Sequence, residues 1–353
     1  MATEIEQSTK PRYSFKHLWD QVFPALISIV IAVVIGGLLL LVNGRDPLAA
    51  YASLWSGAFG SFSRFTETLV RTTPFLILAI SVSVSFRCEV WNIGAEGQFM
   101  LGAILSTWVA LSFASLPIYL LFPLTFIAAF IGGAFWSGIA GALKAYLNAN
   151  EVITTSMLNY IAIYLTAFLV NGPMKDPQGF NFPQSSLIES TLELPHLFPG
   201  TRLNVGFLIA LALVLFAIFF WRSGLGFRTE IVGASRRVAK YAGLNVPRTI
   251  LFVSILTGGL AGIAGWGEIF GIQYRLIQNI ATGWGNLAIV IALLGELHPV
   301  GMVVSAFLFA SMVVGGDAMQ RNSGVPFALV DVIQGIVILL VLSRSYFFKR
   351  SPE

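Results

Sequence analysis

Apolar runs of about twenty residues, separated by short polar stretches, repeat along almost the whole chain. An α-helix needs a run of about that length to cross the hydrocarbon core of a bilayer. The segment 284–297 is short for this purpose, so a nine-span alternative, in which it is re-entrant, stays open. The ten spans predicted by the pattern are 22–42, 68–86, 94–113, 117–141, 152–171, 204–221, 249–270, 284–297, 300–316 and 327–343.

The spans define one transmembrane domain over 22–345 in an all-α polytopic protein. A cytoplasmic or interfacial segment, 1–21, precedes this domain, and a cytoplasmic tail, 346–353, follows it. The first span comes after several basic residues and is not followed by an Ala-x-Ala cleavage pattern. It therefore has the features of an uncleaved signal anchor with its N-terminus inside.

The basic residues test this orientation, because short cytoplasmic loops carry an excess of Lys and Arg. With ten spans and both termini inside, fourteen of the 21 basic residues lie on the cytoplasmic side and seven outside. Arg344, Lys349 and Arg350 favour ten spans over nine. We therefore expect a multi-pass protein of the plasma or inner membrane with both termini in the cytoplasm.

Composition excludes a soluble enzyme, because 56% of the residues are hydrophobic and only 11% are charged. A single cysteine, Cys88, excludes a disulfide framework, and three separated histidines make a metal site at Glu296 and His298 a poor interpretation. No Gly-x-x-x-x-Gly-Lys-Ser/Thr run occurs, so the chain has no P-loop for ATP. We expect no bound cofactor, no metal and no nucleic acid, and membrane lipid as the surroundings.

Polar residues and glycines interrupt the apolar pattern at 87–98. Polar, glycine-broken backbone at a span boundary is tolerated only against protein or a water-filled cavity. We therefore expect Trp91, Asn92, Glu96 and Gln98 to line a pathway. The alternative is a short cytoplasmic turn whose Glu residues are solvated or pair with Arg87.

A second, weaker break lies at 265–273, where Trp266 and Glu268 stand within an apolar run. If spans two to five repeat as spans seven to ten, the two halves are inverted repeats with breaks at matched positions. Such repeats are typical of transporters. Identity between the halves is too low to establish the repeat from the sequence, so it is a hypothesis.

The predicted cytoplasmic loop 222–248 is rich in basic residues, and its small and apolar positions have helical spacing over 230–243. We expect one short helix there, ended by Gly243 and Pro247. A helix of small residues is suited to a groove on a soluble partner. The alternative is a charge cluster that only fixes the topology.

Four segments, 89–99, 150–160, 242–246 and 288–295, resemble the integral membrane permeases of ABC importers. The family is the branched-chain amino acid, ribose and nucleoside permease family, and the first two segments resemble its nucleoside and simple-sugar branch. The run Gly-Trp-Gly-Asn at 283–286 departs from the Gly-Tyr-Gly-Phe type expected in that branch. Substrate preference could therefore differ from the norm of the branch.

The resemblance implies a fold of about ten helices and uptake of nucleosides by alternating access. It implies three protein partners: a second, homologous permease, a soluble ATPase that uses the ATP, and an outer substrate-binding lipoprotein. By position, the substrate pathway would be formed by Trp91, Asn92, Glu96, Gln98, Trp266 and Glu268. The ATPase would dock on the loop that contains Arg228, Glu230, Ala234, Arg236, Ala239, Gly243 and Pro247.

Three alternatives belong to other substrates or classes. One is a simple-sugar permease of the ribose type in the same family. Another is an ion-coupled transporter, in which Glu96, Glu268 and Asp331 carry protons or sodium, but this leaves the basic loop without a role. A membrane enzyme is disfavoured, because the sequence offers no nucleophile and base pair or metal constellation.

Overall fold

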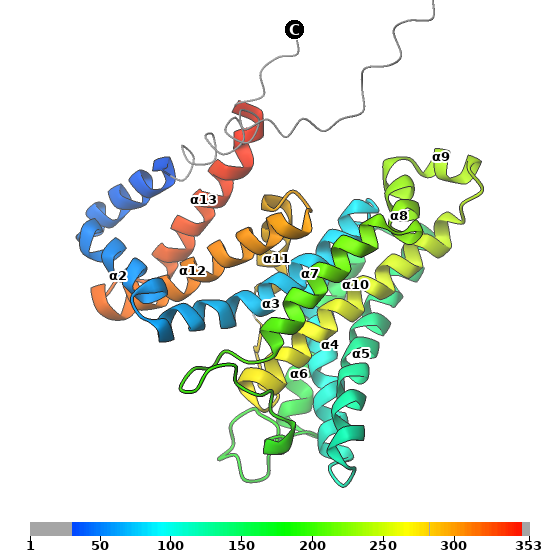
Figure 1. Ribbon diagram of the computed structural model, residues 1–353, viewed down its shortest axis with the longest axis horizontal. Helices are drawn as coiled ribbons and strands as arrows, with labels where there is room; N and C mark the ends of the chain where they lie inside the picture. Colours follow the sequence, from blue (N-terminus) through cyan, green and yellow to red (C-terminus); the bar gives the residue numbers. More distant parts are fainter. Residues whose placement is uncertain (1–29, 282, 348–353) are drawn as a thin grey trace, which may run out of the picture. The chain divides into compact units, whose positions relative to one another are not determined.

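The computed structural model describes residues 30–281 and 283–347, and its regular elements there are helical apart from two isolated β-bridges (Figure 1). The all-α prediction is therefore confirmed. The predicted segment 1–21, the start of the first span and most of the tail 346–353 lie outside the described residues. Chain contacts divide the protein into two compact units, one of 54–318 and one formed by the two terminal parts of the chain.

Helices occupy the predicted spans, but their ends differ by up to several residues. A helix over Val30–Val42 covers the described part of the first span. A further helix, α2, is short, lies between two predicted spans and was not predicted by the pattern of apolar runs. The elements are α2 (Pro47–Phe59), α3 (Phe62–Arg87), α4 (Ala95–Ser112), α5 (Ile118–Leu147), α6 (Glu151–Asn171), η1 (Ser190–Leu192), α7 (Gly206–Arg222), α8 (Gly224–Ala234), α9 (Arg236–Tyr241), α10 (Val246–Glu268), η2 (Ile269–Gln273), α11 (Trp284–Leu294), α12 (Pro299–Ser323) and α13 (Phe327–Phe347).

Within the part of the chain that the structure describes, length and hydropathy identify five candidate spans, or six with one bent pair. Within the described residues, α3, α5, α6, α10 with η2, and α12 are long and apolar enough to cross a membrane, and α7 with α8, bent by 71°, makes a sixth candidate. Glu96 and Gln98 lower the hydropathy of α4, and α11 has only 11 residues. The protein is thus a multi-pass helical membrane protein, while the number ten is not confirmed. The inverted repeat stays a prediction.

The centre of the unit 54–318 is α10, which packs most extensively on α5 and also on α3 and α4. Glycines allow this close approach: a Cβ on Gly133 would lie 2.0 Å from the carbonyl oxygen of Gly258, and one on Gly102 would lie 2.3 Å from Cα of Gly262. The small-residue clusters of these helices therefore serve packing where lipid provides no hydrophobic driving force between helices.

The loop between α7 and α10 contains two helices, α8 and α9, so the expectation of one helix over 230–243 is wrong. The chain is extended at Ser235, which has a φ of −165° and whose hydroxyl accepts a hydrogen bond from the Val238 N–H at 3.3 Å. A serine in this role begins a new helix, because its side chain satisfies one of the free N–H groups of the first turn. Gly243, with a φ of +77°, follows the end of α9, whereas Pro247 lies in the first turn of α10 instead of ending a helix.

The terminal unit is held by contacts between distant parts of the chain. The Tyr51 hydroxyl donates to the carbonyl of Val33 at 2.7 Å. The Arg45 guanidinium donates to the carbonyl of Ser323 at 3.3 Å, and the hydroxyls of Ser53 and Ser323 lie 2.9 Å apart. These contacts join the start of α2 to the Val30–Val42 helix and to the end of α12.

Candidate functional site

The predicted break between the second and third spans is present as the loop 88–94, between α3 and α4. Trp91 lies on this loop, its side chain is 51% exposed, and its ring centroid is 4.8 Å from that of Phe86. A large aromatic residue so exposed at a loop is available to a neighbouring molecule or a solute.

Asn92 and Gln98, both predicted to line the pathway, contact one another. Their side-chain amides exchange two hydrogen bonds of 3.1 and 2.9 Å, and the Asn92 side-chain oxygen, Oδ1, also accepts from the Gly94 N–H at 2.8 Å. Both side chains are buried. In this structure the amides therefore fix the turn into α4, and a solute could reach them only if this pair opened.

The same loop is supported by α6, which the sequence analysis had not connected to it. The Asn159 amide accepts from the Gly97 N–H and donates to the Ile93 carbonyl, both at 2.8 Å. The Thr155 hydroxyl accepts from the Ile93 N–H at 3.2 Å. Two segments that carry the family resemblance, 89–99 and 150–160, thus form one polar unit.

Glu96 joins the first turn of α4 to the start of α11. Both of its carboxylate oxygens lie 3.2 Å from the Gly283 nitrogen, whose N–H they accept, and the side chain is buried. The N-terminus of a helix carries partial positive charge, so a carboxylate placed at two such ends is stabilised by both. Glu96, which was predicted to line a pathway, therefore lies where α4 and α11 begin.

The beginning of α11 lies beside the middle of α3, and its Trp284 side chain is half-buried. The Trp284 ring packs edge-on against Phe75, which stands midway along α3, and against Phe99 of α4, at centroid distances of 5.6 and 5.8 Å. A helix of 11 residues that starts at this depth spans only about half of a bilayer core. The chain enters this region from η2 and Leu276, beside the loop between α6 and α7, and leaves it at Leu297, which Arg87 contacts beside α8. The stretch from η2 to Leu297 therefore crosses the unit with only its second half helical, which does not fit the re-entrant alternative for 284–297.

Trp266 and Glu268 point to different neighbours. The Trp266 indole is buried, donates to the Thr125 hydroxyl at 3.1 Å and packs among the rings of Phe122, Phe126 and Phe270. Glu268 accepts from the Gln273 amide at 2.9 Å across the π-turn η2. The structure therefore does not bring these two predicted pathway residues together.

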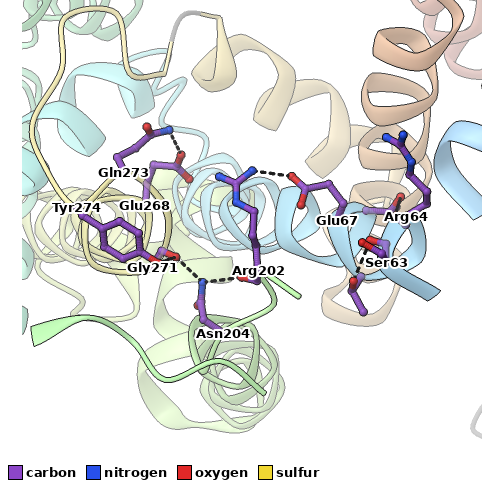
Figure 2. A network of polar contacts seen from close by, with 11 residues as sticks. Ser63, Arg64, Glu67, Arg202, Asn204, Glu268, Gly271, Gln273 and Tyr274 are labelled. Carbon is purple, nitrogen blue, oxygen red and sulfur yellow. Dashed lines mark hydrogen bonds and ion pairs between the residues drawn. The ribbon is translucent and has the colours of Figure 1, made fainter. Parts of the chain in front are cut away.

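Glu268 belongs to a polar network that the sequence analysis missed (Figure 2). Arg202, from the long loop before α7, donates to Glu67 of α3 at 3.1 Å, and the Asn204 amide donates to the Gly271 carbonyl at 3.0 Å. A cavity of about 50 Å³ lies here. Its lining includes Glu67, Arg71, Arg202, Glu268 and Gln273. The charged residues at 64–71, which lie in and beside an apolar run, could have indicated this network from the sequence.

The predicted coupling loop lies at the end of the 54–318 unit opposite the loop between α6 and α7 (Figure 1). Arg87, the last residue of α3, donates to Glu230 of α8 and to the Leu297 carbonyl, both at 2.9 Å. Its guanidinium carbon also lies 4.3 Å from the centroid of the Trp221 ring. The alternative in which Arg87 pairs with a Glu of its own turn is wrong, because its partner is on α8. Asp331 lies in α13, which belongs to the terminal unit.

The surface of α8 and α9 combines basic and exposed apolar side chains. Arg228 is exposed and lines a hollow of about 390 Å³ together with Gly243 and Arg248. Ala234 is exposed and Arg236 half-buried, but Ala239 is fully buried and cannot itself contact a partner. The exposed large apolar side chains on this surface are Leu225, Phe227, Val238 and Tyr241.

The described helices and their buried polar breaks define a membrane protein of the permease class. Residues 64–342 match the family described as the permease component of branched-chain amino acid transport systems, and the chain belongs to that family. The resemblance to ABC importer permeases is thereby confirmed. Membership implies an ATPase subunit and a substrate-binding protein as partners.

Three relatives place the chain near the nucleoside and sugar permeases. It is 38% identical to the glucose ABC transporter permease protein TsgB13 of Haloferax volcanii, over 98% of this chain and 93% of that protein. It is 35% identical to the guanosine ABC transporter permease protein NupP of Bacillus subtilis, over 90% and 92%. It is 33% identical to the nucleoside ABC transporter permease protein NupB of Lactococcus lactis, over 91% and 90%.

Proposed function

We propose that this chain is the permease subunit of an ABC importer that takes up nucleosides, with both termini in the cytoplasm. The observation that carries the permease assignment is the contact between the starts of α4 and α11. There Glu96 accepts from the Gly283 N–H, and the next residue, Trp284, packs on Phe75 in the middle of α3. Transporters use helices that begin inside the membrane to present free N–H groups to polar solutes. Nucleosides are favoured because two of the three relatives above are guanosine and nucleoside permeases.

The energy for uptake would come from a separate ATPase that docks on α8 and α9. The exposed apolar side chains there, such as Phe227 and Tyr241, lie among basic residues and suit an interface with a soluble partner. Arg87 would transmit movement of α8 to the loop before α4 and to the Leu297 turn. A second permease subunit and an outer binding lipoprotein would complete the importer.

The proposed solute pathway contains Trp91, Asn92, Glu96 and Gln98. Their contacts in this structure support a closed state, because the Asn92 and Gln98 amides satisfy one another. Alternating access would require this pair to exchange its mutual bonds for bonds to a solute. Trp266, enclosed by Phe122 and Phe126, would support the wall of the pathway from behind.

Uptake of labelled guanosine by cells with and without the gene tests the assignment. Loss of uptake in the deletion strain, with competition by unlabelled nucleosides but not by glucose or leucine, is the expected result. A simple-sugar permease is the second candidate, favoured by the 38% identity to the glucose permease. Loss of sugar uptake with unchanged guanosine uptake would establish that candidate instead.

A further inference from the structure

The cavity beside Glu268 is built from charged side chains, although it lies within an apolar bundle. Glu268 is only 5% exposed, yet it lines the cavity at the end of α10 remote from α8 and α9. Burial of an acidic group in such surroundings is costly unless it has partners or a task. Three other charged residues, Glu67, Arg71 and Arg202, line the same space.

The protein uses only part of the hydrogen-bonding capacity of the Glu268 carboxylate. Within the described residues Glu268 forms no ion pair, and its carboxylate accepts a single hydrogen bond, from the Gln273 amide to Oε1. Arg202 is already engaged with Glu67. The guanidinium of Arg71 lies over the Trp284 ring, 5.1 Å from its centroid, so its N–H groups are not committed to a carboxylate. The Glu268 carboxylate can therefore still accept hydrogen bonds from a molecule in the cavity, and the Arg71 guanidinium can still donate them.

The size of the cavity limits what it could hold. A cavity of about 50 Å³ holds a few waters, since one water needs ~10–15 Å³ of such space, so it has room for a pair of hydroxyl groups. Hydroxyl groups both donate and accept hydrogen bonds, so a pair of neighbouring hydroxyls matches a carboxylate, an amide and a guanidinium arranged around one small space. A base would require flat apolar walls instead.

We propose that this cavity is a subsite for the vicinal hydroxyls of a sugar ring, with Glu268 accepting from them and Arg71 and Gln273 as further contacts. The inference rests on the proposed function and specifies which part of the solute is recognised. Guanosine and glucose, named in two of the relatives, both carry vicinal hydroxyls, and only one of them carries a base. A subsite for the sugar explains how one fold serves both.

The subsite also lies next to the predicted pathway. Arg71 bridges the two places, because its guanidinium lines the cavity on one side and covers Trp284 on the other. Trp284 begins α11, one residue after Gly283, whose N–H is bound by Glu96. The Arg71 and Trp284 side chains therefore connect the subsite to the start of α4.

The test uses the complete importer, with ATPase and binding protein, in proteoliposomes, and compares initial uptake of guanosine and 2′-deoxyguanosine. The variant is Glu268→Gln, and Glu189→Gln, an exposed carboxylate on the outer loop, is the matched control. The binding protein is the same in all liposomes, so its own preference cancels when each variant is divided by wild type. Gln273→Ala, which removes the amide donor to Glu268, is a second variant should the first fail to assemble.

Glu268→Gln should lower guanosine uptake about tenfold, because a charge-assisted hydrogen bond is lost, and should change 2′-deoxyguanosine uptake much less. Glu189→Gln should change neither. An equal loss for both solutes would mean that Glu268 only stabilises the fold, and an unchanged ratio in every variant would also overturn the subsite. If wild type takes up neither guanosine nor glucose, the proposed function and the subsite both fail.

Discussion

The guanidinium of Arg87 donates to the carboxylate of Glu230 at 2.9 Å, across 143 positions of the sequence. The pair connects the last residue of α3 to α8. Because the Glu230 side chain is 47% exposed, such a pair contributes at most ~1 kcal/mol to stability. Its position is more informative than its energy, since the same guanidinium also holds the Leu297 carbonyl and the Trp221 ring.

Arg87→Lys should therefore uncouple the importer more than it destabilises it. A lysine keeps the charge but cannot donate to Glu230 and Leu297 in fixed directions while it covers an aromatic face. We expect uptake per ATP hydrolysed to fall several-fold, with less than ~1 kcal/mol lost in stability. Uptake and ATP hydrolysis in proteoliposomes measure this. Arg222→Lys, at an exposed arginine in the last turn of α7, is the control and should leave the ratio unchanged.

Replacement of Tyr241 by aspartate should release the ATPase without harming the permease. The Tyr241 side chain is 87% exposed at the end of α9, so a charge there meets only the proposed partner. Ala239→Asp would act differently, because Ala239 is fully buried and a charge there disrupts the packing of α9 itself. Copurification of the ATPase with each variant, normalised to the amount of permease in the membrane, separates the two effects. Full ATPase recovery with Tyr241→Asp would contradict the docking surface.

Glu96→Ala should reduce guanosine uptake strongly. The substitution removes the carboxylate that accepts from the Gly283 N–H, and a hydrogen bond to a charged group contributes ~1.5–3 kcal/mol. That amount corresponds to a loss of about tenfold or more if it falls on the transporting conformation. Glu96→Gln, which retains one acceptor oxygen, should lose less. Equal uptake by Glu96→Ala and wild type would show that the contact between α4 and α11 has no part in transport.

The glycine contacts between α5 and α10 lead to a prediction about stability. Gly133→Ala would place a Cβ 2.0 Å from the Gly258 carbonyl oxygen, so the two helices must separate. Overpacking of this kind costs ~1–3 kcal/mol. Gly138→Ala is the matched control on the same helix, because its Cβ would meet only Ile255, at 3.6 Å. Thermal denaturation in detergent should show a lower transition temperature for Gly133→Ala alone.

The sequence predicts well what depends on local pattern. Apolar runs located the described spans, and glycine with polar residues located the break before α4. It could not predict which side chains meet: Glu96 and Gly283 are 187 positions apart, and Glu67 and Arg202 are 135 apart. A single sequence contains no record of such pairs.

Helix breaks inside a periodic pattern were equally hard to predict. The small residues of α8 and α9 keep helical spacing across Ser235, so the period alone indicated one helix. The capping serine before two arginines was the signal, and it requires attention to single residues instead of the period. The neighbours of Trp266 could not be predicted for another reason. Spacing along α10 does not reveal that its indole faces Thr125 on α5, away from the cavity beside Glu268.

The single cysteine, Cys88, should resist thiol reagents in the folded protein. It is fully buried in the turn after α3, and burial raises the pKa of its thiol to about 12. Only a very small fraction of this thiol is ionised between pH 7 and pH 9, so its labelling by a maleimide should remain far slower than that of an exposed thiol over this whole range. Arg237→Cys, on the exposed side of α9, should label rapidly and increasingly over the same range, since an ordinary thiol ionises near pH 8.5. Rapid labelling of the native protein at Cys88 would show that the loop 88–94 opens to solvent, and its dependence on ATP would then report on that opening.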